Sequence, residues 1–298
     1  MGDPLMLAPP ERLADFVDWP AEPEHVGRWP VYVDYDDSIL DRTRLLSGGA
    51  VSEIDRSSGV KAVIRRALRR VTNPDGRTRG NIDTLVDTLT RERARATVLV
   101  VGGGDIGNGA DRLYSDPGVE VLAFDIYAGE NVQFVADAHK IPFSDASVDA
   151  VVVQAVLEHV LDPARVVAEI HRVLRPDGLV YAETPFLQQV HEGPYDFTRF
   201  TESGHRWLFR AFSRLDSGVV GGSGVQLIWT LGAVAAGVTR SKAVGRLTRL
   251  TLFWLRFLDH VIPPSMQVDG ASGVFFLGRR AERPLSAAEM PGQYRGAQ

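Results

Sequence analysis

The chain has 298 residues, no cysteine and a formal net charge of −5, and 44% of its residues are hydrophobic. This composition is typical of a globular protein, and the absence of cysteine excludes disulfides, cysteine-ligated zinc and cysteine nucleophiles. The acidic balance argues against a nucleic-acid partner. We see no secretory signal and no apolar run long enough to span a bilayer, so we expect a cytoplasmic protein without a transmembrane segment.

Residues 1–96 are expected to form an amino-terminal extension, irregular at first and then helical. The first fifty residues are rich in proline and weakly patterned, so they allow no firm assignment. Apolar residues then recur at helical spacing over 60–71 and over 82–94, which predicts two amphipathic helices. We expect the extension to lie over the binding cleft of the domain that follows.

From residue 97 the pattern changes to strands separated by helices. Five short apolar runs predict strands at 97–101, 119–124, 132–135, 148–153 and 179–183. Asp162 and Pro163 have the residue types of a helix start, an N-cap followed by a first-turn proline. This alternation indicates βαβ units and a buried parallel sheet.

Two further strands are predicted at 213–220 and 273–279. We therefore expect an α/β domain over residues 97–281, with a seven-stranded Rossmann-like sheet, helices on both faces and one antiparallel strand near the edge. Residues 225–262 would form a helical insertion, and residues 282–298 a carboxy-terminal tail.

Within the insertion, the apolar run at 225–238 predicts a buried helix. The next helix, at 243–262, carries Arg246, Arg249, Arg256 and His260 on one broad side and apolar or aromatic residues on the rest. We expect a core helix with a solvated edge. The alternative is a basic amphipathic helix that lies on a membrane surface.

The first predicted strand ends in the glycine-rich run GGGDIGNG, residues 102–109. Such a loop lets the backbone approach a ligand closely and leads into a helix N-terminus. Asp125 ends the second strand eighteen residues after Gly107, where its carboxylate could accept both hydroxyls of a ribose. Gly102, Gly104 and Gly107 also satisfy G-x-G-x-x-G, so these features alone are equally compatible with a nicotinamide oxidoreductase.

Four segments in succession extend this pattern. They are VLVVGGGDIGNG, the strand that ends in Asp125, ADAHKIPFSDASVDAVVVQAVLEHV and LRPDGLVYAETP. In order and spacing they resemble class I S-adenosylmethionine-dependent methyltransferases, closely over 97–185 and more loosely to 281. The resemblance implies S-adenosyl-L-methionine as cofactor and S-adenosyl-L-homocysteine as product. One departure is Val101, where the family often has an acid.

The resemblance also assigns roles to single residues. The glycines would lie under the methionine moiety, Asp125 would hold the ribose, and Asp137 would meet the adenine amino group. Gln154 and Ala155 would border the sulfonium. The cofactor-binding residues expected in this way are Gly102, Gly104, Gly107, Asp125, Ile126, Asp137, Ala138, Gln154 and Ala155.

The loop after the fifth strand, residues 186–200, should contact the methyl acceptor, because ligands of parallel sheets lie beyond the carboxyl ends of the strands. An acceptor hydroxyl is a poor nucleophile until a base removes its proton. We expect His191 to be this base, with Asp196 as its orienter or as the base itself. The substrate-binding candidates are Glu192, Tyr195, Arg199 and His159.

Purely structural roles for these residues remain open. Asp196 and Arg199 could form a helix cap and a salt bridge in a surface loop, and His159 could simply hydrogen-bond at a helix start. His191, Glu192 and Asp196 could also hold a divalent metal, but their spacing fits no strong motif and none is predicted.

The run HEGPYDFTRF resembles methyltransferases associated with sugar and surface-polysaccharide biosynthesis. It favours O-methylation of a carbohydrate or related small-molecule acceptor. The alternatives are a quinone, lipid or other aromatic acceptor, and a cofactor-binding partner subunit without activity. A homo-oligomer remains open.

Overall fold

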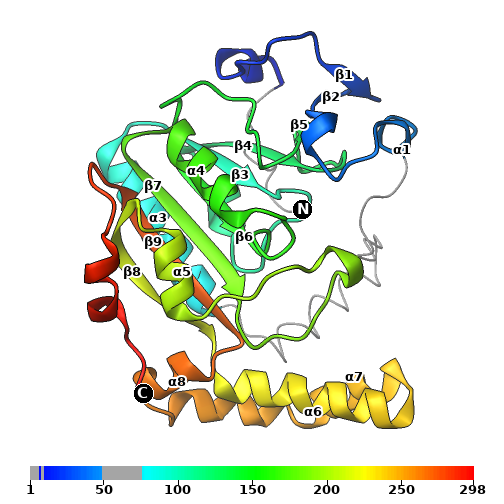
Figure 1. Cartoon of the computed structure of the whole chain (residues 1–298), viewed down its shortest axis with the longest axis vertical. Coiled ribbons are helices and arrows are strands. Elements are labelled where there is room, and N and C mark those ends of the chain that lie inside the picture. The colour runs from blue at the N-terminus through cyan, green and yellow to red at the C-terminus, as the bar shows by residue number, and fades with distance from the viewer. Residues whose placement is uncertain (1–6, 8–9, 49–75) are drawn as a thin grey trace.

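The computed structural model describes residues 7, 10–48 and 76–298. A nine-stranded sheet in the order β1-β2-β5-β4-β3-β6-β7-β9-β8 forms its centre (Figure 1). The strands are β1 (Glu24–Val26), β2 (Trp29–Tyr32), β3 (Ala96–Val101), β4 (Val119–Asp125), β5 (Phe134–Ala136), β6 (Val148–Gln154), β7 (Leu174–Pro185), β8 (Phe212–Gly221) and β9 (Gly273–Arg280).

The seven strands predicted from the sequence form the main part of this sheet. β5, β4, β3, β6 and β7 are parallel neighbours, whereas β9 runs antiparallel to both β7 and β8. Every residue of β3 and β4 is buried, as the continuous apolar runs predict for strands covered on both faces. The Rossmann-like α/β fold is confirmed, with one antiparallel strand next to the edge.

The amino-terminal extension adds two strands that the sequence analysis did not assign. β1 and β2 form an antiparallel hairpin, and β2 continues the sheet in parallel with β5 through Val31 and Tyr32. Both strands are short and β2 contains Pro30, so neither gives a clear alternating pattern. The helix expected at 60–71 lies outside the described residues.

Helices cover both faces of the sheet (Figure 1). The α-helices of the described residues are α1 (Arg42–Leu46), α3 (Gly76–Glu92), α4 (Pro163–Val173), α5 (Glu202–Leu208), α6 (Ser223–Thr239), α7 (Lys242–Thr251) and α8 (Pro264–Asp269). α3 buries Ile82 and Leu85 in one core cluster, while α4 buries Val166 and Ile170 in the cluster on the other face. Asp162 caps α4 as expected, because its carboxylate accepts the Arg165 N–H at 3.0 Å.

The helix expected after the glycine loop is replaced by a single 3₁₀ turn, η3 (Asp111–Tyr114). All residues between β3 and β4 are described, and the segment that follows the glycines is too short for a regular helix before Pro117 and Gly118. A helix N-terminus therefore does not contribute to ligand binding at this loop.

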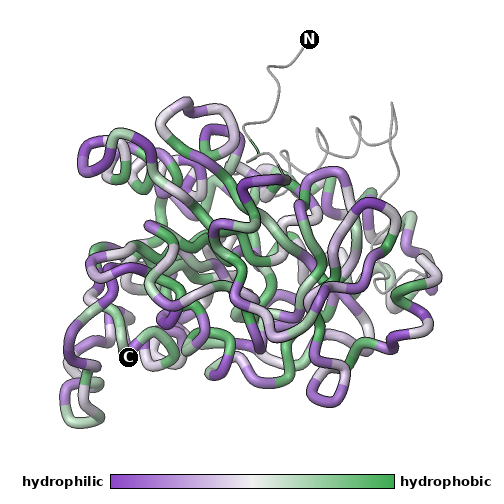
Figure 2. Tube along the Cα trace, turned by 90° about the horizontal axis from the view of Figure 1, so that it is seen from above, coloured by the Kyte–Doolittle hydropathy of each residue, from purple (hydrophilic) through white to green (hydrophobic). Residues whose placement is uncertain are grey.

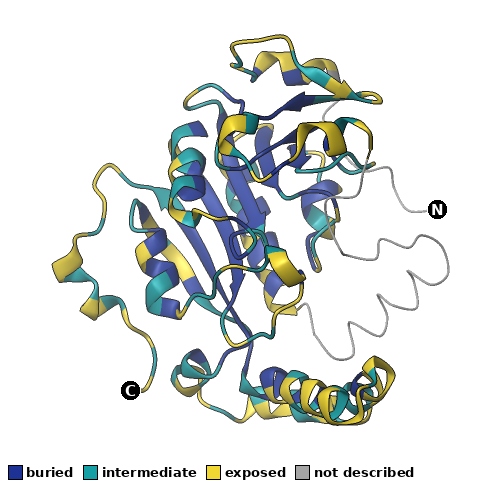
Figure 3. Ribbon diagram, turned by 45° about the vertical axis from the view of Figure 1, so that its right-hand side comes forward, coloured by how far each residue is buried: buried dark blue, intermediate teal, exposed yellow. Residues whose placement is uncertain are grey.

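The expectation of buried helices in the insertion holds for the first turns of α6, where Val225 and Ile228 are buried, and is wrong for the rest. α6, α7 and the 3₁₀ helix η5 (Phe253–His260), here called the helical arm, extend away from the sheet and are largely exposed (Figure 3). Only Gly245 is buried in α7, and no residue of η5 is buried. The apolar pattern identified helices correctly but could not show that their apolar sides lack a cover. Among the described residues, none of the helices has the length and hydropathy required to cross a bilayer.

Figure 2 shows hydrophobic and hydrophilic stretches alternating along the chain. The tail after β9 forms two short 3₁₀ turns, η6 (Ala287–Glu289) and η7 (Pro291–Gln293). Arg295 in this tail donates to the Ser217 carbonyl of β8 at 2.8 Å, so the tail lies along the outer strand.

Burial of His205 generates a testable dependence of stability on pH. This side chain of α5 is fully buried against Phe209, and burial lowers its pKa from 6.5 to about 3. Between those pH values the unfolded chain binds the extra proton, so the free energy of unfolding should fall as the pH decreases below about 6.5. The expected loss between about pH 6.5 and 5 is about 2 kcal/mol.

Urea unfolding of the wild type and His205→Leu at several pH values measures this effect. Because the other histidines are present in both proteins, the difference between the two curves isolates His205. The difference should change by about 2 kcal/mol over this interval. Parallel curves would show that His205 does not have a depressed pKa.

Candidate functional site

The glycine loop is fixed against the carboxyl end of β4. Gly102 has a φ of +76°, a conformation that favours glycine, and the N–H groups of Gly102 and Gly103 donate to the Phe124 carbonyl at 3.0 and 2.8 Å. One carboxylate oxygen of Asp125 accepts the Gly104 N–H at 2.9 Å, and the other accepts the Ile126 N–H at 2.7 Å. The predicted ribose-binding carboxylate therefore lies directly beside the predicted methionine-binding loop.

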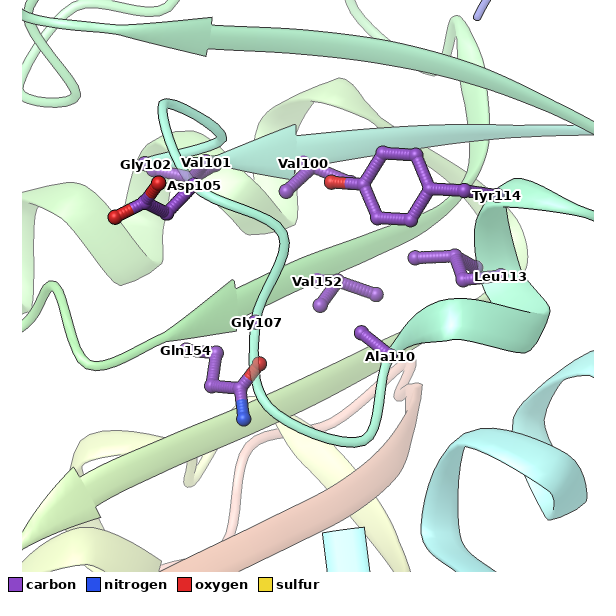
Figure 4. A pocket seen from close by; sticks show the side chains of 10 residues that line it. All are labelled: Val100, Val101, Gly102, Asp105, Gly107, Ala110, Leu113, Tyr114, Val152 and Gln154. Atoms are coloured by element: carbon purple, nitrogen blue, oxygen red, sulfur yellow. The ribbon is translucent and has the colours of Figure 1, made fainter. Parts of the chain in front are cut away.

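Because glycine has no side chain, neighbouring groups come close to the backbone of this loop. A Cβ atom at Gly104 would stand 2.2 Å from the Tyr127 hydroxyl, and one at Gly107 would stand 1.8 Å from Oε1 of Gln154. Gln154 lies next to Gly107 where the loop passes the end of β6 (Figure 4). Beneath the loop is a cavity of about 20 Å³, enough for a single water molecule. The three glycines thus form a backbone cradle of the kind that a nucleoside-bearing ligand needs.

Asp137 follows β5 and is held by three donors. Its carboxylate accepts from the backbone N–H and Nδ1 of His139 at 2.9 and 2.6 Å, and from the Ser38 hydroxyl at 2.5 Å. Burial acts to raise the pKa of Asp137, but these hydrogen bonds outweigh it and the pKa lies below its usual range. The group is therefore ionised at neutral pH, and its neighbour Ala138 is buried.

The amino-terminal extension contributes to this region. Ser38 reaches Asp137, and Asp34 accepts from Lys140 at 2.7 Å. Asp37 pairs with Arg165 at the start of α4 at 2.5 Å. Residues 34–38 consequently lie beside the end of β5, next to the group that the sequence analysis placed against adenine.

A polar network that the sequence analysis missed lies behind Gln154. Glu183 of β7 accepts from Gln154 at 2.7 Å and from Thr78 of α3 at 2.6 Å, and it also accepts from the Tyr181 hydroxyl. Burial raises the pKa of Glu183, against the opposing effect of these hydrogen bonds. A lone glutamate in the apolar run LVYAE was the available signal. Next to it, Ala155 takes a φ of 54°, which is unusual for a residue other than glycine and marks a strained turn.

The loop at residues 186–200, here called the acceptor loop, brings His191, Asp196 and Arg199 together as expected. Asp196 accepts the His191 N–H at 3.0 Å, and its Oδ2 lies 3.3 Å from Nδ1 of the same histidine. Arg199 grips the same carboxylate with both terminal nitrogens. Burial acts to raise the pKa of Asp196, but the hydrogen bonds outweigh it and the pKa is lowered. Asp196 therefore remains an ionised partner of His191.

Arg199 is committed to the loop itself. Besides Asp196, it donates to the carbonyls of Gln188 and Thr198 at 3.0 and 2.8 Å. The salt bridge between Asp196 and Arg199 that a purely structural role predicts is present. The Asp196 side chain does not cap a helix among the described residues and instead holds His191. The geometry makes Arg199 a positioning residue for the loop.

A second histidine and a buried acid complete this cluster. His159 accepts or donates at Nε2 toward Nε2 of His191, 3.1 Å away, while its Nδ1 lies 2.8 Å from the Tyr195 carbonyl. His159 forms hydrogen bonds, as its structural role predicts, but it forms them with the acceptor loop rather than at a helix start. Glu158 is fully buried, with Oε1 at 3.7 and 3.8 Å from the two Nε2 atoms, and burial raises its pKa to about 8.

The same three residues are the group that could hold a metal ion. Ligand atoms of Glu158, His159 and His191 lie within 4.8 Å of one another. Both oxygens of Glu158 lack a hydrogen-bond partner among the described residues. The set differs from the three residues considered in the sequence analysis, because Glu192 and Asp196 are replaced by Glu158 and His159.

The remaining candidates occupy the same loop. Glu192 is buried and Tyr195 is half-buried within the short turn η4 (Gly193–Tyr195). The loop is tied to the strand ends, since Phe197 donates to the Glu158 carbonyl at 2.8 Å and Phe200 donates to the Pro185 carbonyl at 3.2 Å. The segment after β6 lies against the glycine loop, because a Cβ at Gly102 would meet Val156, two residues before Glu158, at 2.2 Å.

Comparison with known proteins agrees with this geometry. Residues 102–182 match a family model described as a methyltransferase domain. The match, the strand order and the glycine loop agree with a class I domain of the S-adenosylmethionine-dependent methyltransferases. S-adenosyl-L-methionine is the cofactor of this class, and the matched segment contains the glycine loop, the strands β4, β5 and β6, and both Asp125 and Asp137.

Curated relatives match parts of the chain. It is 43% identical over 161 residues to an uncharacterised 37.1 kDa protein in transposon Tn4556 of Streptomyces fradiae (53% of this chain, 39% of that one). It is 35% identical over 114 residues to a probable S-adenosylmethionine-dependent methyltransferase of Mycolicibacterium smegmatis (35% and 43%).

A third relative is a ubiquinone/menaquinone biosynthesis C-methyltransferase of Hahella chejuensis, 38% identical over 104 residues (29% of this chain, 41% of the relative). The chain spans less than half the length of each of these three relatives.

Replacing Asp125 should weaken cofactor binding strongly. If Asp125 holds the ribose, Asp125→Ala would remove two charge-assisted hydrogen bonds to it, each contributing about 1.5–3 kcal/mol, so affinity should fall about 100-fold or more. Isothermal calorimetry with S-adenosylhomocysteine measures the change. Asp145→Asn, an exposed acid on the turn before β6, serves as the control. Unchanged affinity in a folded Asp125→Ala protein would refute the ribose role.

Proposed function

We propose that the protein transfers a methyl group from S-adenosylmethionine to a hydroxyl oxygen of a carbohydrate or related small molecule. The observation that carries this proposal is the pairing of His191 with the ionised Asp196 in the loop that follows β7, in the same sheet whose strand β3 leads into the glycine loop. Methyl transfer to a hydroxyl needs a proton acceptor, and this pair supplies one where an acceptor can reach it.

The cofactor would bind across the strand ends. The methionine part would lie on Gly102 and Gly104, the ribose on Asp125, and the adenine between Ile126 and the Asp137–Ala138 turn. Because the existing cavity is only about 20 Å³, Tyr127 and Gln154 would have to rotate away from the glycines. Gln154, backed by Glu183, would then border the sulfonium together with Ala155.

The cofactor supplies an electrophilic methyl group, which moves from sulfur to the acceptor oxygen as the C–S bond breaks and the C–O bond forms. The hydroxyl proton would pass to Nε2 of His191 once this nitrogen has released its hydrogen bond to Nε2 of His159. Burial and the nearby His159 lower the pKa of His191, so the ring is neutral before the reaction and free to accept. Asp196 stabilises the resulting imidazolium through Nδ1, and Arg199 holds Asp196 in place. Glu192, Tyr195 and His159 border the space for the acceptor.

Removing the base should abolish most turnover without changing cofactor binding. His191→Ala should lower the rate by about 100- to 10,000-fold, the usual contribution of general-base catalysis. Asp196→Asn should give a milder loss if Asp196 orients His191, and an equal or larger loss if Asp196 is the base. Initial rates on a responsive acceptor, with S-adenosylhomocysteine affinity measured in parallel, separate the two roles.

His25→Ala is the matched control, because His25 is an exposed histidine of β1 remote in sequence from the acceptor loop. It should retain the wild-type rate. A His191→Ala enzyme with a near-normal rate would remove His191 from the chemistry.

A metal-assisted version of the same transfer is favoured by one observation, the convergence of Glu158, His159 and His191. If His191 acts directly as the base, dialysis against EDTA should leave the rate unchanged. Metal analysis of the purified protein should also find less than one divalent ion per chain. A rate lost on chelation and restored by Mg²⁺, Mn²⁺ or Zn²⁺ would assign these three residues to a cation instead.

Carbon methylation of a quinone is the alternative acceptor chemistry, supported by the relative from Hahella chejuensis. The methylated atom decides between the two. With a cofactor carrying a deuterated methyl group, mass spectrometry of the product of a carbohydrate panel and of a demethylated quinone should find the label on oxygen. Label on a ring carbon would favour the quinone.

A further inference from the structure

The helical arm exposes an unusual amount of apolar surface. From the second half of α6 onward, large side chains are open to solvent, among them Val238 (81% exposed), Leu247 (61%) and Trp254 (52%). Beyond the end of the arm, Val261 is 79% exposed. Large exposed apolar areas on a globular protein mark a surface that another partner covers.

The helices of the arm pack through their small residues. A Cβ at Gly245 of α7 would meet the Gly232 carbonyl of α6 at 2.6 Å and the Ala236 side chain at 2.7 Å. The two backbones are therefore in close contact, and the large apolar side chains project outward. In water the opposite arrangement is expected, whereas helices in lipid contact one another through small residues.

Charge on the arm is strongly basic. Residues 223–263 contain five basic residues, Arg240, Lys242, Arg246, Arg249 and Arg256, and one acid, Asp259, in a chain whose net charge is −5. Asp259 is turned inward, where it accepts the Gly224 N–H at 2.6 Å and holds η5 to the start of α6. The outer surface is thus cationic.

Basic and apolar residues occupy different sides of α7. Lys242, Arg246 and Arg249 follow one another at three- and four-residue spacing, as do Val244, Leu247 and Thr251 on another face. In η5 the Arg256 guanidinium lies over the rings of Phe253 and Phe257, at 5.7 and 5.0 Å from their centres. This combination of cations, aromatic rings and exposed leucines is typical of helices that lie in a lipid interface.

We propose that the helical arm docks this protein on the surface of an anionic lipid bilayer, with the apolar side chains of α7 and η5 inserted among the acyl chains and the basic residues at the headgroups. The arm lies in the interface and does not cross it. Charge complementarity selects an anionic lipid surface, and the outward apolar side chains require an apolar phase.

The docked arm would hold the acceptor loop close to the membrane. The Gln226 side chain of α6 donates to the Leu187 carbonyl at 2.8 Å, and Gln189 donates to Thr230 at 3.2 Å. Loop residues Leu187 and Val190 are themselves exposed. An amphipathic acceptor held in the bilayer would therefore meet the loop that carries His191. This last point rests on the proposed function, whereas membrane docking does not.

Co-sedimentation of the full chain with vesicles tests the docking. The protein should sediment with vesicles of phosphatidylcholine and phosphatidylglycerol (3:1), and about 10-fold less with phosphatidylcholine alone. Raising the salt concentration should weaken binding, since the headgroup attraction is screened. Equal binding to both kinds of vesicle would overturn the role of charge, and no binding to either would overturn the proposal.

Two arm variants and two matched controls locate the surface. Leu247→Ser combined with Trp254→Ser, and Lys242→Gln combined with Arg246→Gln, should each reduce binding to anionic vesicles about 10-fold or more. Leu215→Ser on β8 and Arg44→Gln on α1 remove an equally exposed apolar or basic group elsewhere and should bind as the wild type does. All six substitutions are at exposed positions, and thermal melts verify folding.

Self-association is the competing explanation for the exposed arm. Light scattering without lipid should give the mass of one chain, or a mass that the arm variants leave unchanged. A dimer that the Leu247 and Trp254 changes dissociate would show that the arm is covered by a second copy and would overturn membrane docking. S-adenosylhomocysteine affinity of the arm variants should stay unchanged, which separates failure of docking from failure of the methyltransferase site.

Discussion

Parallel pairing of β3 with β4 and β6 is the constraint on which the candidate site depends. Parallel strands end at the same edge of a sheet, so residues far apart in sequence meet there. The groups gathered in this way are Gly102 after β3, Asp125 at the end of β4, Asp137 after β5, Gln154 at the end of β6 and Glu183 near the end of β7. The strands themselves are held by apolar residues buried on both faces, which is why the edge is rigid enough to position polar groups.

Much of the fold could be predicted from the sequence, for identifiable reasons. Continuous runs such as TVLVV are readable because both faces of the sheet are covered. The β1–β2 hairpin was missed because strands of three and four residues, one with Pro30, carry too little periodicity. The helical arm was misplaced because periodicity shows that a helix has an apolar side, not whether the protein itself covers that side.

The candidate site, too, could be predicted only in part. Motif spacing predicted the glycine loop and Asp125 because each directly follows a readable strand. It also predicted that His191, Asp196 and Arg199 share one loop. It could not show that the guanidinium of Arg199 is engaged in holding Asp196. Motif spacing could not predict contacts between distant segments, because these depend on the tertiary fold. Examples are the contacts of Ser38 with Asp137, of Thr78 with Glu183, and of Glu158 with two histidines.

The central claim is that this sheet edge binds S-adenosylmethionine rather than a dinucleotide, which the same glycine spacing would allow. Calorimetric titration of the wild-type chain with S-adenosylhomocysteine and, separately, with NAD tests it most directly. We predict one saturable site for S-adenosylhomocysteine and no heat of binding with NAD. Saturable binding of NAD together with no response to S-adenosylhomocysteine would contradict the account.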